Sequence, residues 1–114
     1  MTAAAQVLEA ELEGFLRKRV RLLGGYTIKL APTERGVPDR LVIMPGGGMF
    51  LVELKTEVGH LSPIQEHWHT RIRKLGGEVY VLHGKTGIIT WLRCVVGSRD
   101  TRSRKPPKVA AGVR

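Results

Sequence analysis

The chain has 114 residues, enough for one small domain with a modest core, and its 19 lysines and arginines against 10 acidic residues give a net charge of +9. The sequence has no apolar run long enough to span a bilayer and no segment that resembles a secretory signal, and its single cysteine excludes an internal disulfide. We therefore expect a soluble cytoplasmic protein that is not secreted, has no membrane partner and binds a polyanion.

The first half of the chain predicts a helix followed by three strands. Residues 3–23 have the apolar period of a helix, which a glycine pair terminates, and residues 26–30 are typical of a strand. Residues 40–44 and 49–54 are two further apolar runs on either side of a glycine-rich turn, so they predict a β-hairpin.

The second half predicts a helix, a strand and a terminal segment. Ser62 is the expected N-cap of a helix that Pro63 begins and a second glycine pair ends. Its expected buried face consists of Ile64, Trp68, Ile72 and Leu75. Residues 78–82 predict a strand parallel to a central one, because a helix supplies the crossover. Residues 86–96 fit either another strand or a short packed helix, and residues 97–114 indicate a flexible basic tail after a domain of residues 1–96.

Two acids and a lysine occupy neighbouring positions of the predicted hairpin. Side chains alternate along a strand, so Glu53 and Lys55 face the same side, and antiparallel pairing can bring Asp39 alongside Glu53. Two carboxylates with room for waters and a phosphate suit Mg²⁺ or Mn²⁺, and a nearby ammonium can help to deprotonate an attacking water or offset transition-state charge. The plainer alternatives are a turn aspartate and an exposed ion pair.

A third acid comes from the first helix. At about 100° per residue, Glu9 projects between Leu16 and Val20 at the edge of the apolar arc, whereas Glu11 and Glu13 point further out. A carboxylate in that position is costly unless something compensates its charge. Glu9 is therefore either a member of the same site or a partly solvated helix charge.

Other polar residues have ordinary structural explanations. Gln65 can complete a capping box with the helix N-cap. His67 and His69 are two positions apart on a helix, so they point in nearly opposite directions and are expected to be solvated. Arg40 is expected to pack at the edge of the core or to form a surface ion pair. Cys94 has apolar neighbours and is expected to be a packed thiol.

The excess positive charge lies largely in the tail, where six cations stand against one acid, a net of +5. The alternatives for this tail are contact with phosphates, which is independent of base sequence, and an idle solvated segment. We favour phosphate contact, because acidic metal ligands need cations elsewhere to hold an anionic substrate. The expected contact residues are His60, Arg71, Lys74, Arg99, Arg102, Arg104 and Lys105.

An ordered series of motifs connects these observations. The series comprises Gly24-Gly25, Gly36-Val37-Pro38-Asp39-Arg40-Leu41, Val52-Glu53-Leu54-Lys55, Gly59, Leu61-Ser62, Gln65 and Gly76-Gly77 before Val79. Over roughly residues 7–84 it resembles the VRR-NUC domain, the virus-type replication-repair nuclease of the PD-(D/E)xK restriction-endonuclease-like superfamily. The resemblance implies an αβββαβ core with a mixed central sheet flanked by helices.

The resemblance also implies a nuclease that uses Mg²⁺ or Mn²⁺, with Lys55 as the catalytic lysine and Gln65 as an accessory active-site residue. The implied metal ligands are Asp39, Glu53, the backbone carbonyl of Leu54 and Glu9. Stand-alone phage-type members of this family form homodimers that cut branched DNA such as four-way (Holliday) junctions, and this short chain resembles that class. We expect a homodimeric DNA-repair endonuclease of a bacterial or phage-infected cell, without a small-molecule cofactor. The alternatives are a non-catalytic basic module that binds DNA junctions and, third, a nuclease that acts on RNA.

Overall fold

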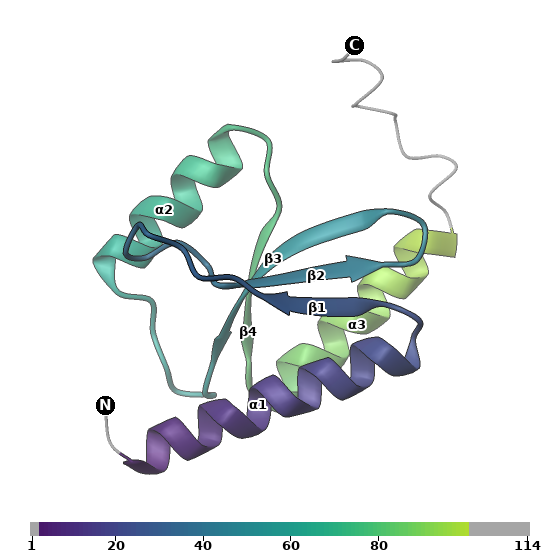
Figure 1. Cartoon of the computed structure of the whole chain (residues 1–114), viewed down its shortest axis with the longest axis horizontal. Coiled ribbons are helices and arrows are strands. Elements are labelled where there is room, and N and C mark those ends of the chain that lie inside the picture. Colours follow the sequence, from purple (N-terminus) through teal and green to yellow (C-terminus); the bar gives the residue numbers. More distant parts are fainter. Residues whose placement is uncertain (1–2, 101–114) are drawn as a thin grey trace.

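The computed structural model describes the backbone of residues 3–100 and the side chains of residues 8–96. Within that range the elements alternate between helix and sheet (Figure 1). They are α1 (Ala3–Leu22), β1 (Tyr26–Lys29), β2 (Arg40–Met44), β3 (Gly48–Lys55), α2 (Pro63–Lys74), β4 (Val79–His83) and α3 (Gly84–Asp100). The predicted mixed α/β class is confirmed. The segment 86–96, which the sequence left open between strand and helix, belongs to a helix.

The described strands form one mixed sheet in the order β1-β2-β3-β4. β1 and β3 are antiparallel to β2, whereas β4 is parallel to β3 because α2 connects the two. The turn between β2 and β3 contains Gly46 and Gly47 with φ of 96° and 97°, a conformation that glycine adopts without steric cost. The predicted hairpin and the predicted parallel fourth strand are therefore both present.

Both α1 and α2 end at a glycine pair, as predicted. The first glycine of each pair, Gly24 and Gly76, has φ of 88° and 93°. The second, Gly25 and Gly77, donates its N–H to the carbonyl oxygen five residues earlier, at 2.9 Å in both helices. This Schellman motif satisfies free carbonyls at the end of each helix and reverses the chain into the strand that follows.

One face of the sheet carries the hydrophobic core. Residues of α1 and α3 pack there against Val42, Met44 and Val52, and the two helices lie side by side (Figure 1). The α3 contacts follow the spacing i, i+3, i+4, i+7 with Ile88, Trp91, Leu92 and Val95. Cys94 falls outside this stripe and is exposed, so the expectation of a packed thiol is wrong.

Only part of the predicted buried face of α2 is present, since Trp68 and Ile72 are half-buried but the other two residues are exposed. Ile64 and Leu75 are 42% and 82% exposed, and the residue of α2 that the fold buries is His69. The reason is that α2 lies over the polar end of β3, at Glu53, and not over an apolar row of the sheet. None of the helices in the described range is long and apolar enough to cross a membrane.

Candidate active site

Asp39 and Glu53 are neighbours at the end of the hairpin. The register pairs Arg40 with Val52, so the next step outward places Asp39 opposite Glu53. The Asp39 carbonyl accepts a 2.7 Å hydrogen bond from the Leu30 N–H, which ties the aspartate backbone to the end of β1. Pro38 is fully buried and fixes the approach of the chain to β2. The predicted juxtaposition of the two carboxylates is therefore present.

A cavity of about 170 Å³ lies at this end of the sheet. It is lined by Glu9, Glu13, Asp39, Arg40, Glu53, Leu54, Lys55 and Gln65. All six residues that the sequence proposed as metal ligands or catalytic groups therefore reach one cavity, from α1, the β2–β3 hairpin and α2. The lining also includes an acid and an arginine that the sequence did not place there.

The Glu53 carboxyl group lies in an unusual electrostatic environment. Its side chain is 13% exposed, and burial raises the pKa of Glu53 from the ordinary 4.5 to about 7. Lys55 lowers that pKa, while Asp39 and Glu9 raise it further by repulsion. Three carboxylates and one ammonium thus act on each other across the cavity, and a bound cation would relieve the repulsion among the acids.

The oxygens around this cavity fit a hard divalent cation. Carboxylate and carbonyl oxygens are the ligands that Mg²⁺ and Mn²⁺ prefer, and Asp39, Glu53 and the Leu54 carbonyl can supply them. Among the side chains that the structure describes, no three His, Cys, Asp or Glu residues form a group that holds an ion by itself.

Gln65 bridges the helix cap and the cavity. Its Oε1 accepts a 2.9 Å hydrogen bond from the Ser62 N–H, and the Ser62 hydroxyl accepts one from the Gln65 N–H, so the predicted capping box is present. Its Nε2 meanwhile donates to Glu53 Oε2 at 3.2 Å. The capping role predicted for Gln65 and its contact with a residue of the cavity therefore occur together. Gly36 lets the β1–β2 loop approach this turn, since a Cβ there would lie 2.7 Å from the Ile64 carbonyl oxygen.

His69 corrects a sequence expectation. It is 1% exposed, and its Nε2 lies 3.4 Å from Glu53 Oε1, so it is not a solvated helix residue. His67 is exposed, as expected. The available signal was spacing, because residue 69 is four positions after Gln65 and lies on the same helix face.

Arg40 and Glu13 form a second polar contact beside the cavity. Arg40 is 5% exposed, and its guanidinium donates to Glu13 at 3.0 Å and to the Thr27 hydroxyl at 3.4 Å. Glu13 also pairs with the exposed Lys29 at 3.2 Å. The expectation that Glu13 points away is wrong, because a buried guanidinium needs an anionic partner and α1 supplies it. Of the two roles considered for Arg40, an ion pair is present, but its arginine side chain is buried.

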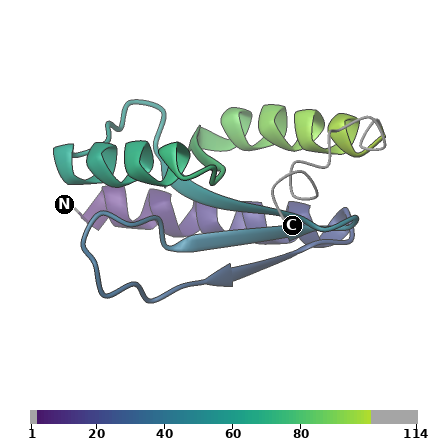
Figure 2. The same cartoon turned by 90° about the horizontal axis from the view of Figure 1, so that it is seen from above.

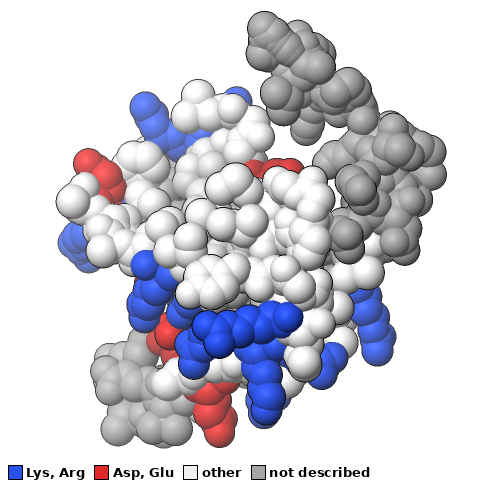
Figure 3. All heavy atoms as spheres, turned by 45° about the vertical axis from the view of Figure 1, so that its right-hand side comes forward, with Lys and Arg blue, Asp and Glu red and all other residues white. Residues whose placement is uncertain are grey.

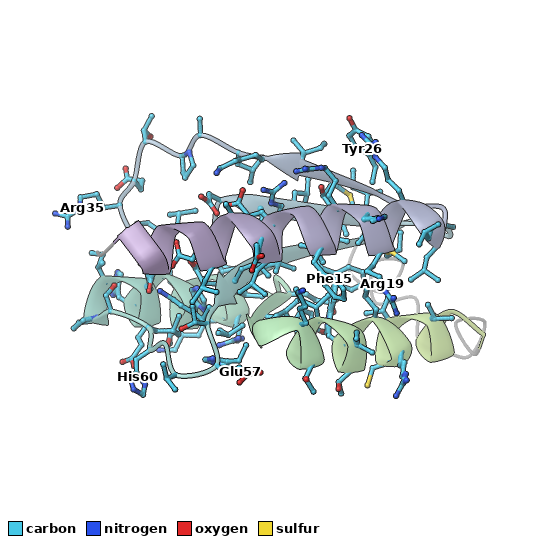
Figure 4. The ribbon with its side chains drawn as sticks, turned by 90° about the horizontal axis from the view of Figure 1, so that it is seen from below. Phe15, Arg19, Tyr26, Arg35, Glu57 and His60 are labelled. Atoms are coloured by element: carbon cyan, nitrogen blue, oxygen red, sulfur yellow. The ribbon has the colours of Figure 1, made fainter. Side chains whose placement is uncertain are left out.

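The structure describes the side chains of some predicted DNA-contact residues and not of others. His60, Arg71 and Lys74 are exposed, and His60 and Glu57 project from the loop between β3 and α2 (Figure 4). α3 extends through residues 97–100, which the sequence assigned to the tail, but the Arg99 side chain lies outside the described side chains. Arg102, Arg104 and Lys105 lie outside the described residues altogether.

The structure shows a basic surface on α1 that was not predicted from the sequence. Arg17, Lys18, Arg19 and Arg21 are all exposed, and the sequence has no acid from residue 14 to residue 33. Arg19 lies over the Phe15 ring and Arg21 over the Tyr26 ring, each 5.4 Å from the centroid. Lysines and arginines gather over the lower part of the molecule in Figure 3, where Figure 1 places α1. The signal was present in the sequence as a run of four cations in five residues.

A hairpin that presents Asp39 and the Glu53–Lys55 pair at the end of a mixed sheet, with helices α1 and α2 adding a carboxylate and an amide, defines a nuclease of the PD-(D/E)xK class. The family model of the VRR-NUC domain matches residues 6–86. The chain belongs to the VRR-NUC family of nucleases.

Two relatives agree with this assignment. The chain is 40% identical over 77 residues to "Putative nuclease p44" of Acyrthosiphon pisum secondary endosymbiont phage 1, which covers 67% of this chain and 83% of that protein. A solved structure described as a VRR_NUC domain is similar with a TM-score of 0.70 and 32% identity, over 75% of this chain and 94% of the other.

Proposed function

We propose that this protein is a DNA endonuclease that depends on Mg²⁺ or Mn²⁺ and selects branched DNA such as four-way junctions. The observation that carries the proposal is the convergence of Asp39, Glu53 and Lys55 on one cavity, together with the raised pKa of Glu53. A buried carboxylate beside two further acids destabilises the fold through charge repulsion, but the same group of oxygens is well suited to bind a cation. Membership of a nuclease family supports the same chemistry.

Six of the eight residues that line the cavity have a role in this proposal. Asp39, Glu53 and the Leu54 carbonyl hold the divalent ion, and Glu9 lies where it adds negative charge from α1. The ion, when bound, polarises the scissile phosphate and makes water a better nucleophile. The Lys55 ammonium offsets negative charge that develops on the phosphate and assists removal of the water proton. Gln65 orients Glu53 through its amide.

Exposed cations on α1 and α2, the two helices that contribute residues to the cavity, support DNA as the substrate. Arg71 and Lys74 lie on the solvent face of α2, and Arg17, Lys18 and Arg21 lie on the solvent face of α1. None of these five side chains forms an ion pair with another described residue. They are therefore free to contact phosphates, which gives affinity without base specificity.

A homodimer is the second part of the proposal, because two active sites are needed to cut opposing strands of a symmetric junction. The support is an apolar surface that we call the outer sheet face. It consists of Tyr26, Ile28, Leu41, Ile43, Met49 and Leu51, which the register places in two adjacent cross-strand rows. Tyr26, Ile28 and Met49 are 53%, 39% and 55% exposed. Such a surface is typical of contact with another protein, and a second copy supplies an identical apolar partner.

The decisive experiment uses end-labelled four-way junction, linear duplex and single-stranded RNA. Wild type, Lys55→Ala and the exposed-residue control His67→Ala are each incubated with Mg²⁺, with Mn²⁺ and with EDTA. We expect wild type and the control to cut the junction only with metal, and Lys55→Ala to bind it but cut about 10²–10⁴-fold more slowly. Binding without cutting under every condition would establish the non-catalytic alternative. Equal cutting of linear and branched DNA would reject the junction preference alone.

A further inference from the structure

His69 is a buried polar residue to which the proposed chemistry assigns no role. Its imidazole is 1% exposed, and Nε2 faces Glu53 Oε1 at 3.4 Å. Its Nδ1 is fully buried and has no hydrogen-bond partner among the described residues. A leucine would fill similar space without leaving a buried nitrogen unsatisfied, which costs about 1–3 kcal/mol. The contact with Glu53 is the interaction that offsets this cost.

The direction of the hydrogen bond follows from the surroundings of the two ring nitrogens. In a neutral imidazole one nitrogen carries the N–H and the other is an acceptor. A proton on Nδ1 would be an unpaired buried donor. A proton on Nε2 instead points at a carboxylate oxygen, so His69 is the donor and Glu53 Oε1 the acceptor.

This donor works together with Gln65. Gln65 and His69 are four residues apart on α2, so they present their donors from one helix face. Gln65 donates to Oε2 and His69 donates to Oε1, and the carboxylate is held at both oxygens. Each oxygen retains a further lone pair, which is available to a cation in the cavity.

We infer that His69 is a positioning residue that fixes the orientation of the Glu53 carboxylate for the divalent cation. It acts through Glu53 and does not touch the substrate. The inference rests on the proposed function, because it needs an ion that Glu53 binds. Outer hydrogen bonds of this kind orient metal ligands, and their loss typically costs 10–100-fold in metal affinity or activity.

The test compares three substitutions by their Mn²⁺ affinity without DNA. His69→Leu removes the donor and keeps an apolar filler, whereas His69→Gln keeps an amide donor near the position of Nε2. His67→Leu is the matched control on the exposed face of the same helix. Mn²⁺ binding is measured by titration calorimetry and by the electron paramagnetic resonance signal of free Mn²⁺, and folding by thermal denaturation in EDTA.

We expect His69→Leu to weaken Mn²⁺ binding about 10–100-fold and His69→Gln to stay within a few-fold of wild type. Cleavage by His69→Leu should recover at high Mn²⁺, because the substitution affects ion binding and not the reacting groups. Equal Mn²⁺ affinity in His69→Leu and wild type, or equal losses in His69→Leu and His69→Gln, would overturn the inference.

A second pair of variants tests the inference if His69→Leu does not fold. His69→Asn is as polar as His69→Gln, but its shorter amide does not reach Glu53, so the inference expects weaker Mn²⁺ binding for Asn than for Gln. Equal affinity in this pair would also count against it. A wild type that neither binds Mn²⁺ nor cuts DNA would instead reject the proposed function, which separates the two failures.

Discussion

Glu53 links the stability of the fold to the chemistry of the site. Its pKa of about 7 lies above the ordinary 4.5, chiefly because of burial, so the folded protein binds this proton more tightly than the unfolded chain does. The ionised form is therefore a cost to the fold. That cost is absent below about pH 4.5, grows as the pH rises to about 7, and is constant above it.

Replacing Glu53 by glutamine should remove this pH dependence. In EDTA, the difference in unfolding free energy between Glu53→Gln and wild type should increase in favour of the variant by up to about 3 kcal/mol between pH 4.5 and pH 7.5, since one pKa unit corresponds to about 1.4 kcal/mol. Urea denaturation across this pH range measures it. Adding Mn²⁺ at pH 7.5 should stabilise wild type and not the variant. Parallel pH curves for the two proteins would mean that Glu53 ionises normally.

The Arg40–Glu13 ion pair should contribute more to stability than the exposed ion pair between Lys29 and Glu13. Glu13→Ala leaves the 5% exposed Arg40 without its anion and should destabilise the protein by about 2 kcal/mol, less than for a fully buried pair because the Glu13 side chain is 32% exposed. Lys29→Ala removes only the exposed partner, at 57%, and should cost under about 1 kcal/mol. Chemical denaturation of both variants checks the order, and equal losses would contradict it.

At the scale of elements, α2 is a support for the end of β3. The capping box fixes the first turn of α2, and the same glutamine side chain that closes the box reaches Glu53. Gln65 therefore contributes both to the start of the helix and to the orientation of the proposed metal ligand. Because Gln65 has both of these roles, a substitution that keeps the capping role and removes the contact with Glu53 can distinguish them.

Gln65→Glu should keep the helix and damage the site. The glutamate still accepts the hydrogen bond from the Ser62 N–H, since capping boxes use either residue. It loses the amide donor to Glu53 and adds a like charge beside it. We expect thermal stability close to wild type and a loss of cleavage of at least about tenfold. Gln65→Ala should lose both, with about 1 kcal/mol of stability. Full activity in Gln65→Glu would exclude the contact with Glu53 as functional.

The features of the fold that the sequence predicted are those that depend on local chemistry. Turn glycines, the Ser62 capping box and period-two alternation each constrain neighbouring residues, and together they located the hairpin and α2. The pairing of Asp39 with Glu53 also followed from local rules, because a short hairpin determines its own register. The sequence therefore predicted that these residues lie close together.

The remaining features depend on which surfaces meet in three dimensions. His69 is buried because α2 lies over Glu53, and Glu13 is recruited because Arg40 is buried between α1 and the sheet. Neither contact is between close neighbours in sequence, since the partners are 16 and 27 residues apart. Periodicity gives the direction of each side chain on its own element, but it does not say what the opposing element presents.

At the scale of the whole molecule, Tyr26 of the outer sheet face and His60 of the DNA-contact residues project on opposite sides, whereas Arg21 lies over the Tyr26 ring. Figure 2 shows β1 at one margin of the molecule, with α2 and α3 along the other. Tyr26 projects at the side of β1, whereas His60 and Glu57 project from the β3–α2 loop on the opposite side (Figure 4). A second copy on the outer sheet face would therefore leave that loop open to DNA.

The dimer is tested most directly at its most exposed apolar residues. Tyr26→Glu and Met49→Glu place a charge on the outer sheet face at positions 53% and 55% exposed, so the monomer fold should tolerate them. Light scattering at micromolar concentration should give twice 12.6 kDa for wild type and 12.6 kDa for the double variant. Leu75→Glu, at the 82% exposed apolar C-cap position of α2, is the control and should remain dimeric. Because burying an unpaired charge at an apolar interface is costly, a double variant that stays dimeric would place the contact elsewhere.

A wild type of 12.6 kDa would exclude the dimer. On a junction labelled in opposing strands, the monomeric variant should still cut single strands but lose paired incision, since each protomer supplies one active site.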